Sequence, residues 1–175
     1  MVPSSGAGTP DQAAWLAVIT GLVSAWFMAD TDKPDVNAAA RCACGGVSVT
    51  VRGRVLSMLM CSCEDCQKAT GSGHSAFALF RADDVTVTGE MKSFERPSSS
   101  GAIFTRWFCP NCGTPLCGRS SRAVSVTVVP VGLFGRTADW YRPNQLIFAR
   151  TLHAWDAVDD SLPRWQTYRD EEELH

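Results

Sequence analysis

The sequence predicts a mainly β domain built from small sheets. Three observations lead to this class. After residue 40, apolar residues alternate with polar ones over several short segments, turn-forming residues separate these segments, and no long, well-capped helical period occurs. The length of 175 residues, with 45% apolar residues, suits a single domain with a real core.

The expected strands follow one another along the chain. Val47, Val49 and Val51 alternate with polar residues in GGVSVTVRG, which is typical of a half-buried strand. Turn formers such as GSG, PSSSG and CPNCG lie between or beside the other expected strands. Those strands have similar patterns and cover residues 75–80, 84–89, 102–108 and 123–129.

The charge balance argues against a nucleic-acid partner. The formal net charge is −2 and the isoelectric point is about 5.9, so the chain has no broad basic field. We therefore expect a small molecule or a protein surface as the partner.

Eight cysteines occur in tight clusters. Closely spaced pairs with distant partners favour metal binding in a reducing compartment over a disulfide framework, so we expect a cytoplasmic protein. The clusters are Cys42 with Cys44, Cys61 with Cys63 and Cys66, and Cys109 with Cys112, and Cys117 lies nearby.

Two of these clusters predict a closed zinc site. Cys109 and Cys112 flank a tight turn in FCPNCGTPL, where Gly113 can adopt a positive φ. CACGG at 42–46 is the available second turn. Four thiolates close a tetrahedral shell without a vacant position, so we expect a structural zinc on the four-sulfur group, which comprises Cys42, Cys44, Cys109 and Cys112.

The remaining cluster lies in the segment CSCEDC. We call it the three-sulfur group, and it comprises Cys61, Cys63 and Cys66. Three protein ligands leave zinc an open fourth position that can bind water or substrate. Three thiolates also give the complex a formal charge of −1, which weakens it toward hard oxygen and favours soft sulfur. We therefore expect a second, catalytic zinc that binds a thiol as its thiolate.

Other side chains near the three-sulfur group leave alternatives open. Cys117 is an alternative fourth ligand, but we interpret it as a buried core residue because it directly follows the Cys109–Cys112 turn. His74 is another candidate fourth ligand or proton carrier, and His153 is a weaker one; a lone histidine at a strand start is more often simply hydrogen bonded. Glu64 and Asp65 either support the ligands or are exposed turn residues.

The motif order CxCG, CxCxxC and FCxxCG resembles the glutathione-dependent formaldehyde-activating enzyme family, which also includes centromere protein V. The resemblance covers roughly residues 41–165. Leu146 in PNQLIF stands where many members carry a histidine. The residues that carry the resemblance are Arg41 to Gly45, Cys61, Cys63, Cys66 and Gly71, Phe108 to Gly113, and the late Trp155, Leu162 and Pro163.

The resemblance implies a β-tent fold of small antiparallel sheets, with a structural zinc on the four-sulfur group and a second zinc on the three-sulfur group. It also implies carbon–sulfur lyase-type activity, in which glutathione and formaldehyde give S-(hydroxymethyl)glutathione, or a related reaction. The partners would then be a small thiol such as glutathione and a small aldehyde. Carboxylates of such a thiol need cationic partners, for which Lys68, Arg106 and Arg150 are unassigned candidates.

Two other functions remain as alternatives. A non-catalytic zinc-binding scaffold or protein-interaction module would have two closed zinc sites. A redox switch would use CSCEDC without metal and form a reversible disulfide.

The expected organisation is an N-terminal extension at 1–40, a zinc-binding domain at 41–168 and an acidic tail at 169–175. Residues 13–29 carry no charge, and three interpretations stay open: a translation start at Met28, a helix, or a targeting segment. We expect no membrane anchor, because 17 residues are at the short limit for crossing a bilayer and no Lys or Arg precedes them.

Overall fold

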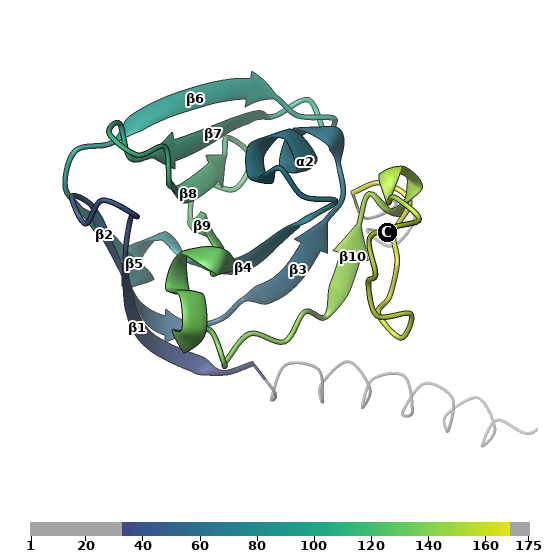
Figure 1. Cartoon of the computed structure of the whole chain (residues 1–175), viewed down its shortest axis with the longest axis horizontal. Coiled ribbons are helices and arrows are strands. Elements are labelled where there is room, and N and C mark those ends of the chain that lie inside the picture. The colour runs from purple at the N-terminus through teal and green to yellow at the C-terminus, as the bar shows by residue number, and fades with distance from the viewer. Residues whose placement is uncertain (1–32, 169–175) are drawn as a thin grey trace, which may run out of the picture. The chain divides into compact units, whose positions relative to one another are not determined.

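The computed structural model describes residues 33–168 (Figure 1). These residues belong, from Pro34 onward, to one compact unit. The expectations for residues 13–29, for Met28 and for the tail at 169–175 lie outside the described residues.

Two sheets make up the described part of the chain (Figure 1). The smaller sheet has three strands, in the order β1 (Asp35–Arg41), β2 (Ser48–Arg54) and β5 (Val85–Thr88). The larger sheet has seven strands, in the order β10 (Gln145–Ile147), β3 (Ser57–Cys61), β4 (Ser75–Arg81), β9 (Val126–Pro130), β8 (Pro115–Ser120), β7 (Ile103–Phe108) and β6 (Lys92–Pro97).

The prediction of a mainly β fold is confirmed. Neighbouring strands pair antiparallel throughout both sheets, except that β10 pairs parallel with β3. The five expected strands correspond to β2, β4, β5, β7 and β9. The alternation in β2 has the consequence expected from its sequence, because Val49 and Val51 are fully buried while Arg52 is exposed.

Five strands lacked a recognisable pattern in the sequence. The segment SMLMC of β3 is apolar without alternation, and most residues of β6 are exposed at the edge of the sheet. Residues 35–40, which the sequence analysis assigned to the N-terminal extension, lie in β1 and pair with β2. In β1 the buried residues include Val36 and Ala40, and the short alanine side chains give only a weak apolar signal.

The main core lies between the two sheets. Val49 and Val51 of the smaller sheet pack in the same cluster as Ala78, Phe80 and other side chains of the larger sheet. A second cluster surrounds the three-sulfur group and contains Leu59, Ile147 and Phe148.

The helical elements are short. Helix α2 (Glu64–Thr70) ends at Gly71, whose φ of 68° lets its N–H reach the Gln67 carbonyl at 2.8 Å. Among the residues that the structure describes, no helix is both long and apolar enough to cross a membrane. Three 3₁₀ turns complete the described elements, at Ala82–Asp84, Val131–Thr137 and Ala149–Thr151.

Candidate metal centres

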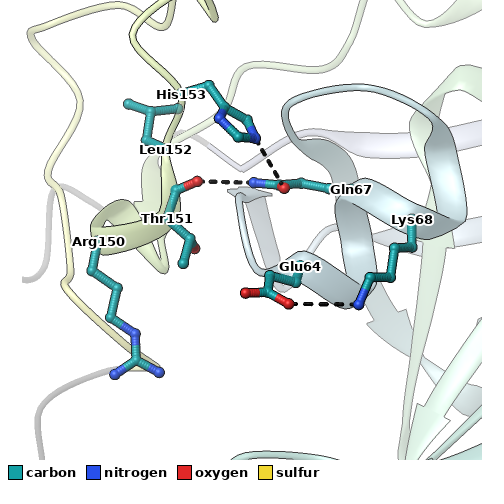
Figure 2. Close-up of a pocket in the computed structure, with 7 residues that line it drawn as sticks. All are labelled: Glu64, Gln67, Lys68, Arg150, Thr151, Leu152 and His153. Carbon is teal, nitrogen blue, oxygen red and sulfur yellow. Dashed lines mark hydrogen bonds and ion pairs between the residues drawn. The ribbon is translucent and has the colours of Figure 1, made fainter.

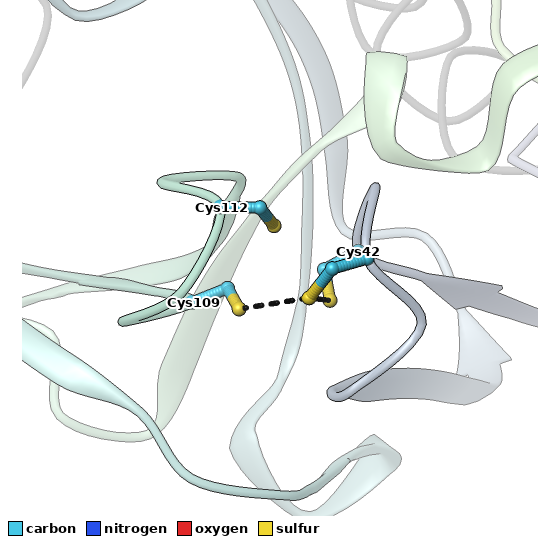
Figure 3. Close-up of side chains that lie close together, drawn as sticks. Cys42, Cys109 and Cys112 are labelled. Atoms are coloured by element: carbon cyan, nitrogen blue, oxygen red, sulfur yellow. Dashed lines mark hydrogen bonds between the residues drawn. The ribbon is translucent and has the colours of Figure 1, made fainter.

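The four-sulfur group lies where the two sheets meet. Cys42 directly follows β1 of the smaller sheet, and Cys109 directly follows β7 of the larger one. Figure 3 shows Cys109 and Cys112 on one turn, with their sulfurs directed toward Cys42 on the other. The group therefore connects the β1–β2 hairpin to the β7–β8 hairpin.

The sulfur positions fit a tetrahedral ion. All four Sγ atoms lie within 4.8 Å of one another and none forms a disulfide. The Cys42 and Cys44 sulfurs are 3.5 Å apart, and the Cys44 and Cys109 sulfurs are 3.7 Å apart. Zinc–sulfur bonds of about 2.3 Å in a tetrahedron place the sulfurs about 3.8 Å from one another. The donor set thus has the chemistry and spacing of a closed thiolate shell.

The two turns have the same backbone construction. Gly45 follows one cysteine pair with a φ of 78°, and Gly113 follows the other with a φ of 72°. Each glycine N–H donates to the carbonyl of the first cysteine of its turn, Cys42 or Cys109, at 2.9 Å. The positive φ expected for Gly113 is confirmed, and its counterpart at Gly45 shows why both turns need glycine.

Thr114 joins the two turns and was not singled out from the sequence. Its Oγ1 accepts the N–H of Ala43 at 3.1 Å, across the junction between the hairpins. The same hydroxyl lies 3.1 Å from the sulfur of Cys112 and is the main cause that lowers the pKa of this thiol to about 5. A hydroxyl directly after a CxxCG turn is the sequence signal that identifies such a residue.

The three-sulfur group is formed over a short stretch of chain. Cys61 is the last residue of β3, Cys63 precedes helix α2, and Cys66 lies in its first turn. The amide of Cys66 donates to the Cys63 carbonyl at 2.9 Å, so the start of the helix brings these two residues together. The three Sγ atoms lie within 4.8 Å of one another, and Cys61 and Cys66 are buried. This donor set also fits a metal ion.

Within the three-sulfur group, Cys63 carries the negative charge most readily. Hydrogen bonds from the Cys61 and Cys66 thiols lower the pKa of Cys63, and the Arg96 charge lowers it further. The pKa of Cys61 is raised, because its thiol donates to Cys63 and because it is buried near other sulfurs. A cation among the sulfurs would favour loss of the remaining protons.

Backbone contacts fix the loop between the three sulfurs. The Ser62 carbonyl accepts hydrogen bonds from Gln67 Nε2 and Thr151 Oγ1, both at 2.8 Å, and its N–H donates to Ile147 at 3.1 Å. Ser62 is fully buried, and its hydroxyl has no hydrogen-bond partner within the described part of the chain. The loop is thus held by side chains from α2 and from the segment after β10.

Cys117 joins neither sulfur group. It lies in β8 opposite Trp107, its side chain is buried, and burial raises its pKa to about 11. Its position agrees with the interpretation as a core residue. Leu146, where the family resemblance suggested a histidine in many members, is fully buried in β10 and pairs with Met60.

Neither histidine considered from the sequence joins the sulfurs. The Nδ1 atom of His74 donates to Oδ2 of Asp156 at 2.6 Å, which connects the start of β4 to the C-terminal segment. His153 donates through Nε2 to the Gln67 Oε1 atom at 3.2 Å, and its ring stacks on Trp155.

The two acidic residues of CSCEDC face different partners. Glu64 pairs with Lys68 one helical turn later at 3.5 Å, and both side chains are exposed. Asp65 pairs with Arg96 of β6 at 2.9 Å. Arg96 is therefore a residue near the three-sulfur group that the sequence analysis missed, because its partner lies 31 positions away and β6 has no distinctive pattern.

A hollow of about 470 Å³ opens beside α2 (Figure 2). It brings together Lys68 and Arg150, two of the three cationic candidates, whereas Arg106 lies elsewhere in β7. Figure 2 shows Gln67 hydrogen bonded to both Thr151 and His153 along its wall. The three sulfurs do not line it. The full lining is Glu64, Gln67, Lys68, Arg150, Thr151, Leu152 and His153.

The fold and its two sulfur groups define a mainly β protein with two candidate metal centres. The family model described as glutathione-dependent formaldehyde-activating enzyme matches residues 37–151, and the chain belongs to this family. The family resemblance noted in the sequence is thereby confirmed.

Curated relatives and a solved structure show more distant similarity. Proteins of Aspergillus flavus and Aspergillus oryzae, named for the same family, are each 29% identical over 90 residues, which cover 51% of this chain and 47% of theirs. The chain thus spans about half the length of the curated relatives it matches. A crystal structure of a Rhodobacter sphaeroides protein has a TM-score of 0.46 and 19% identity, covering 57% of this chain and 89% of that one.

Proposed function

We propose that this chain is a zinc-dependent enzyme of the carbon–sulfur lyase type that handles thiol adducts of aldehydes. The reaction is the combination of glutathione with formaldehyde to S-(hydroxymethyl)glutathione, or a closely related one. Membership of the family and the names of the two fungal relatives support this substrate class. The proposal places the chain in a reducing compartment such as the cytoplasm, because its thiols must stay reduced to hold metal.

The observation that carries the proposal is the unequal number of donors in the two groups. The four-sulfur group can surround an ion completely, whereas the three-sulfur group offers one donor fewer. Within residues 33–168, no further cysteine, histidine or carboxylate completes that second group. We infer that the four-sulfur group holds a structural zinc and that the three-sulfur group holds a catalytic one.

The chemistry follows from the donor set. Cys61, Cys63 and Cys66 would hold the zinc, which would supply a position at which an incoming thiol could release its proton to solvent at neutral pH. The thiol sulfur then donates an electron pair to the carbonyl carbon of the aldehyde and forms the C–S bond. The π pair of the carbonyl moves to oxygen, which takes up a proton. The reverse reaction breaks the same bond and returns the electron pair to sulfur.

The protein's own residues orient this chemistry. The hydrogen bonds that Gln67 and Thr151 make to the Ser62 carbonyl hold the loop of the three-sulfur group in place. Phe148 packs in the cluster that contains Cys61 and Cys66 and shields the buried side of the group from water. A ligand thiol then approaches from the side of Cys63, which is only partly buried.

The hollow beside α2 supports an anionic thiol. Arg150 extends over the Phe148 ring with its guanidinium carbon 5.9 Å from the ring centroid, and Phe148 belongs to the same buried cluster as Cys61 and Cys66. Lys68 lies across the same hollow. We therefore propose that Lys68 and Arg150 attract the carboxylates of a thiol such as glutathione.

Carbon-13 exchange spectroscopy tests the reaction directly. Glutathione and ¹³C-formaldehyde form their adduct slowly without a catalyst, so exchange between free aldehyde and adduct can be measured with and without the zinc-loaded chain. The proposal predicts faster exchange with the chain, loss of this acceleration in Cys63→Ser, and its retention in Cys117→Ala. Equal exchange rates with and without the chain, at full zinc loading, would favour the scaffold function.

A further inference from the structure

Arg96 lies on the same face of the larger sheet as the three-sulfur group. It is paired with Phe104 across β6 and β7, and directly paired residues project from the same face. The strand pairing places Gly118, Val128 and Leu79 on this same face of the sheet. On β3 the face includes Cys61. A side chain from one edge of the sheet thus shares a face with a sulfur near the other edge.

The Arg96 guanidinium is fixed by its surroundings. Its central carbon lies 5.5 Å from the centroid of the Phe104 ring, and its side chain is only 17% exposed. The Phe104 ring in turn lies against Gly118, where an added Cβ would come within 2.5 Å of the ring. Arg96 is therefore held at one place instead of sampling many rotamers, as an exposed arginine would.

The ion pair with Asp65 brings this charge to the three-sulfur group. Nη1 of Arg96 lies 2.9 Å from Oδ2 of Asp65, which stands between Cys63 and Cys66 in helix α2. The same Nη1 donates to the Pro97 carbonyl at 3.2 Å. The guanidinium thus connects the edge strand to the helix that carries Cys66 and begins directly after Cys63.

The charge that accumulates at this group needs a counter-charge. Zinc on three thiolates has a formal charge of −1, and a fourth thiolate makes it −2. Arg96 neutralises Asp65, whose carboxylate between Cys63 and Cys66 would otherwise add to this negative charge. A fixed positive group nearby also favours both states more strongly in a partly buried setting than in water.

We propose that Arg96 is a positioning residue for the three-sulfur group: it offsets the charge of the bound thiolates and holds α2 against the sheet through Asp65. The inference rests on the proposed function, because it assumes that this group takes a metal and a thiol. The charge acts through space and not as a receptor for a ligand carboxylate. Nη1 already bonds to Asp65 and to the Pro97 carbonyl, and Nε is buried without a partner among the described residues. Each pair of adjacent guanidinium nitrogens includes one of these two atoms, so neither pair is free to bind a carboxylate through two hydrogen bonds.

Arg119 provides a matched control. Its guanidinium also lies over an aromatic ring, that of Trp107 at 5.9 Å, and its Nε is likewise buried without a partner in the described region. It differs in its location, because it pairs with Thr105 on the opposite face of the sheet and donates to Thr127.

The experiment is cobalt binding to the full chain and its variants Arg96→Met, Arg96→Lys and Arg119→Met. Chelator competition gives the affinity of the second cobalt. The shift of its thiolate charge-transfer band gives the half-saturating concentrations of glutathione and of the neutral thiol 2-mercaptoethanol. We expect Arg96→Met to weaken the second cobalt and both thiols by about tenfold. Arg96→Lys should retain most of the affinity, and Arg119→Met should match the wild type.

Each other outcome has a defined meaning. Unchanged binding in Arg96→Met, or an equal loss in Arg119→Met, would overturn the inference alone. A loss confined to glutathione would also overturn it, because it would identify Arg96 as a carboxylate receptor. If the wild-type chain binds no second cobalt, the proposed function fails and this inference with it.

Discussion

The sulfur of Cys44 lies 3.7 Å from that of Cys109, although 65 positions separate the two residues in the chain. One belongs to the hairpin of the smaller sheet and the other to a hairpin of the larger sheet. A metal ion bound at this contact would close a long loop and cross-link the two sheets. The stability of the fold should therefore depend on the four-sulfur group more than on any single core side chain.

Removal of one donor from this group should destabilise the whole domain. We predict that Cys109→Ser loses the tightly held zinc and lowers the melting temperature by more than about 10 °C, because metal binding in such sites supplies folding free energy. Calorimetry together with zinc analysis checks this. Cys117→Ala is the control and should keep its full zinc content. Full zinc content and an unchanged melting temperature in Cys109→Ser would contradict the assignment.

Thr114 should contribute through its hydroxyl alone. Thr114→Val keeps the shape of the side chain but removes the acceptor for the Ala43 amide and the donor near the Cys112 sulfur. We predict a loss of about 1–2 kcal/mol in the free energy of unfolding, with zinc still bound. Denaturant titration of the zinc-loaded variant measures it, and a Thr114→Ser variant should recover most of the loss.

The left-handed conformation at Gly113 allows backbone strain to be tested without a side-chain clash. An added Cβ would meet nothing within 4 Å, so the cost of Gly113→Ala arises from the φ of 72°. We predict destabilisation by about 1–2 kcal/mol. Gly132 is the matched control, because it also has open space around it but no positive φ. Gly132→Ala should be neutral or slightly stabilising, and equal effects at the two positions would contradict the explanation.

Cys117 should make the domain less stable in alkali. Burial raises its pKa to about 11 in the folded chain, against about 8.5 in an unfolded one. The folded state therefore holds this proton more tightly, so its stabilising contribution is complete below about pH 8.5 and is lost as the pH rises toward 11. Unfolding free energies of the wild type and Cys117→Ala between pH 8 and 10.5 test this. The wild type should fall more steeply, by up to about 1.4 kcal/mol per pH unit.

Arg150 should discriminate between thiols by their charge. Because Arg150 lies in the hollow beside α2 and over Phe148, its loss should weaken an anionic thiol and spare a neutral one. We predict that Arg150→Met raises the half-saturating concentration of glutathione about tenfold, and that of 2-mercaptoethanol by less than about twofold. Parallel losses for both thiols would show that Arg150 acts on the loop and not on the ligand.

The sequence contained the grouping of the cysteines but not the charges around them. Spacing predicts each local set of sulfurs, because each turn or helix start brings its own cysteines together and the two glycines mark the turns. The two turns were expected to combine because CACGG was the available second turn. Arg96 and Thr114 act through partners in other elements, Asp65 and Ala43, and no local pattern encodes such contacts. Such contacts depend on how distant elements pack together, which no single segment of the sequence specifies.

The strands also divide into those that the sequence predicted and those that it did not. Alternation identified β2 and β5, whose apolar residues face the core between the sheets. It failed for β6, because an edge strand with mostly exposed side chains has no apolar face to display. It also failed for β3, where both faces are covered and the alternation disappears.

Metal stoichiometry measured in the presence of thiol tests the central claim most directly. Purified chain, reconstituted with cobalt, should bind two ions, and added glutathione should shift the charge-transfer spectrum of only one of them. Cys63→Ser should remove the responsive ion, while the other remains. One ion per chain, or two that both ignore the thiol, would contradict the claim that the three-sulfur group leaves a ligand position open.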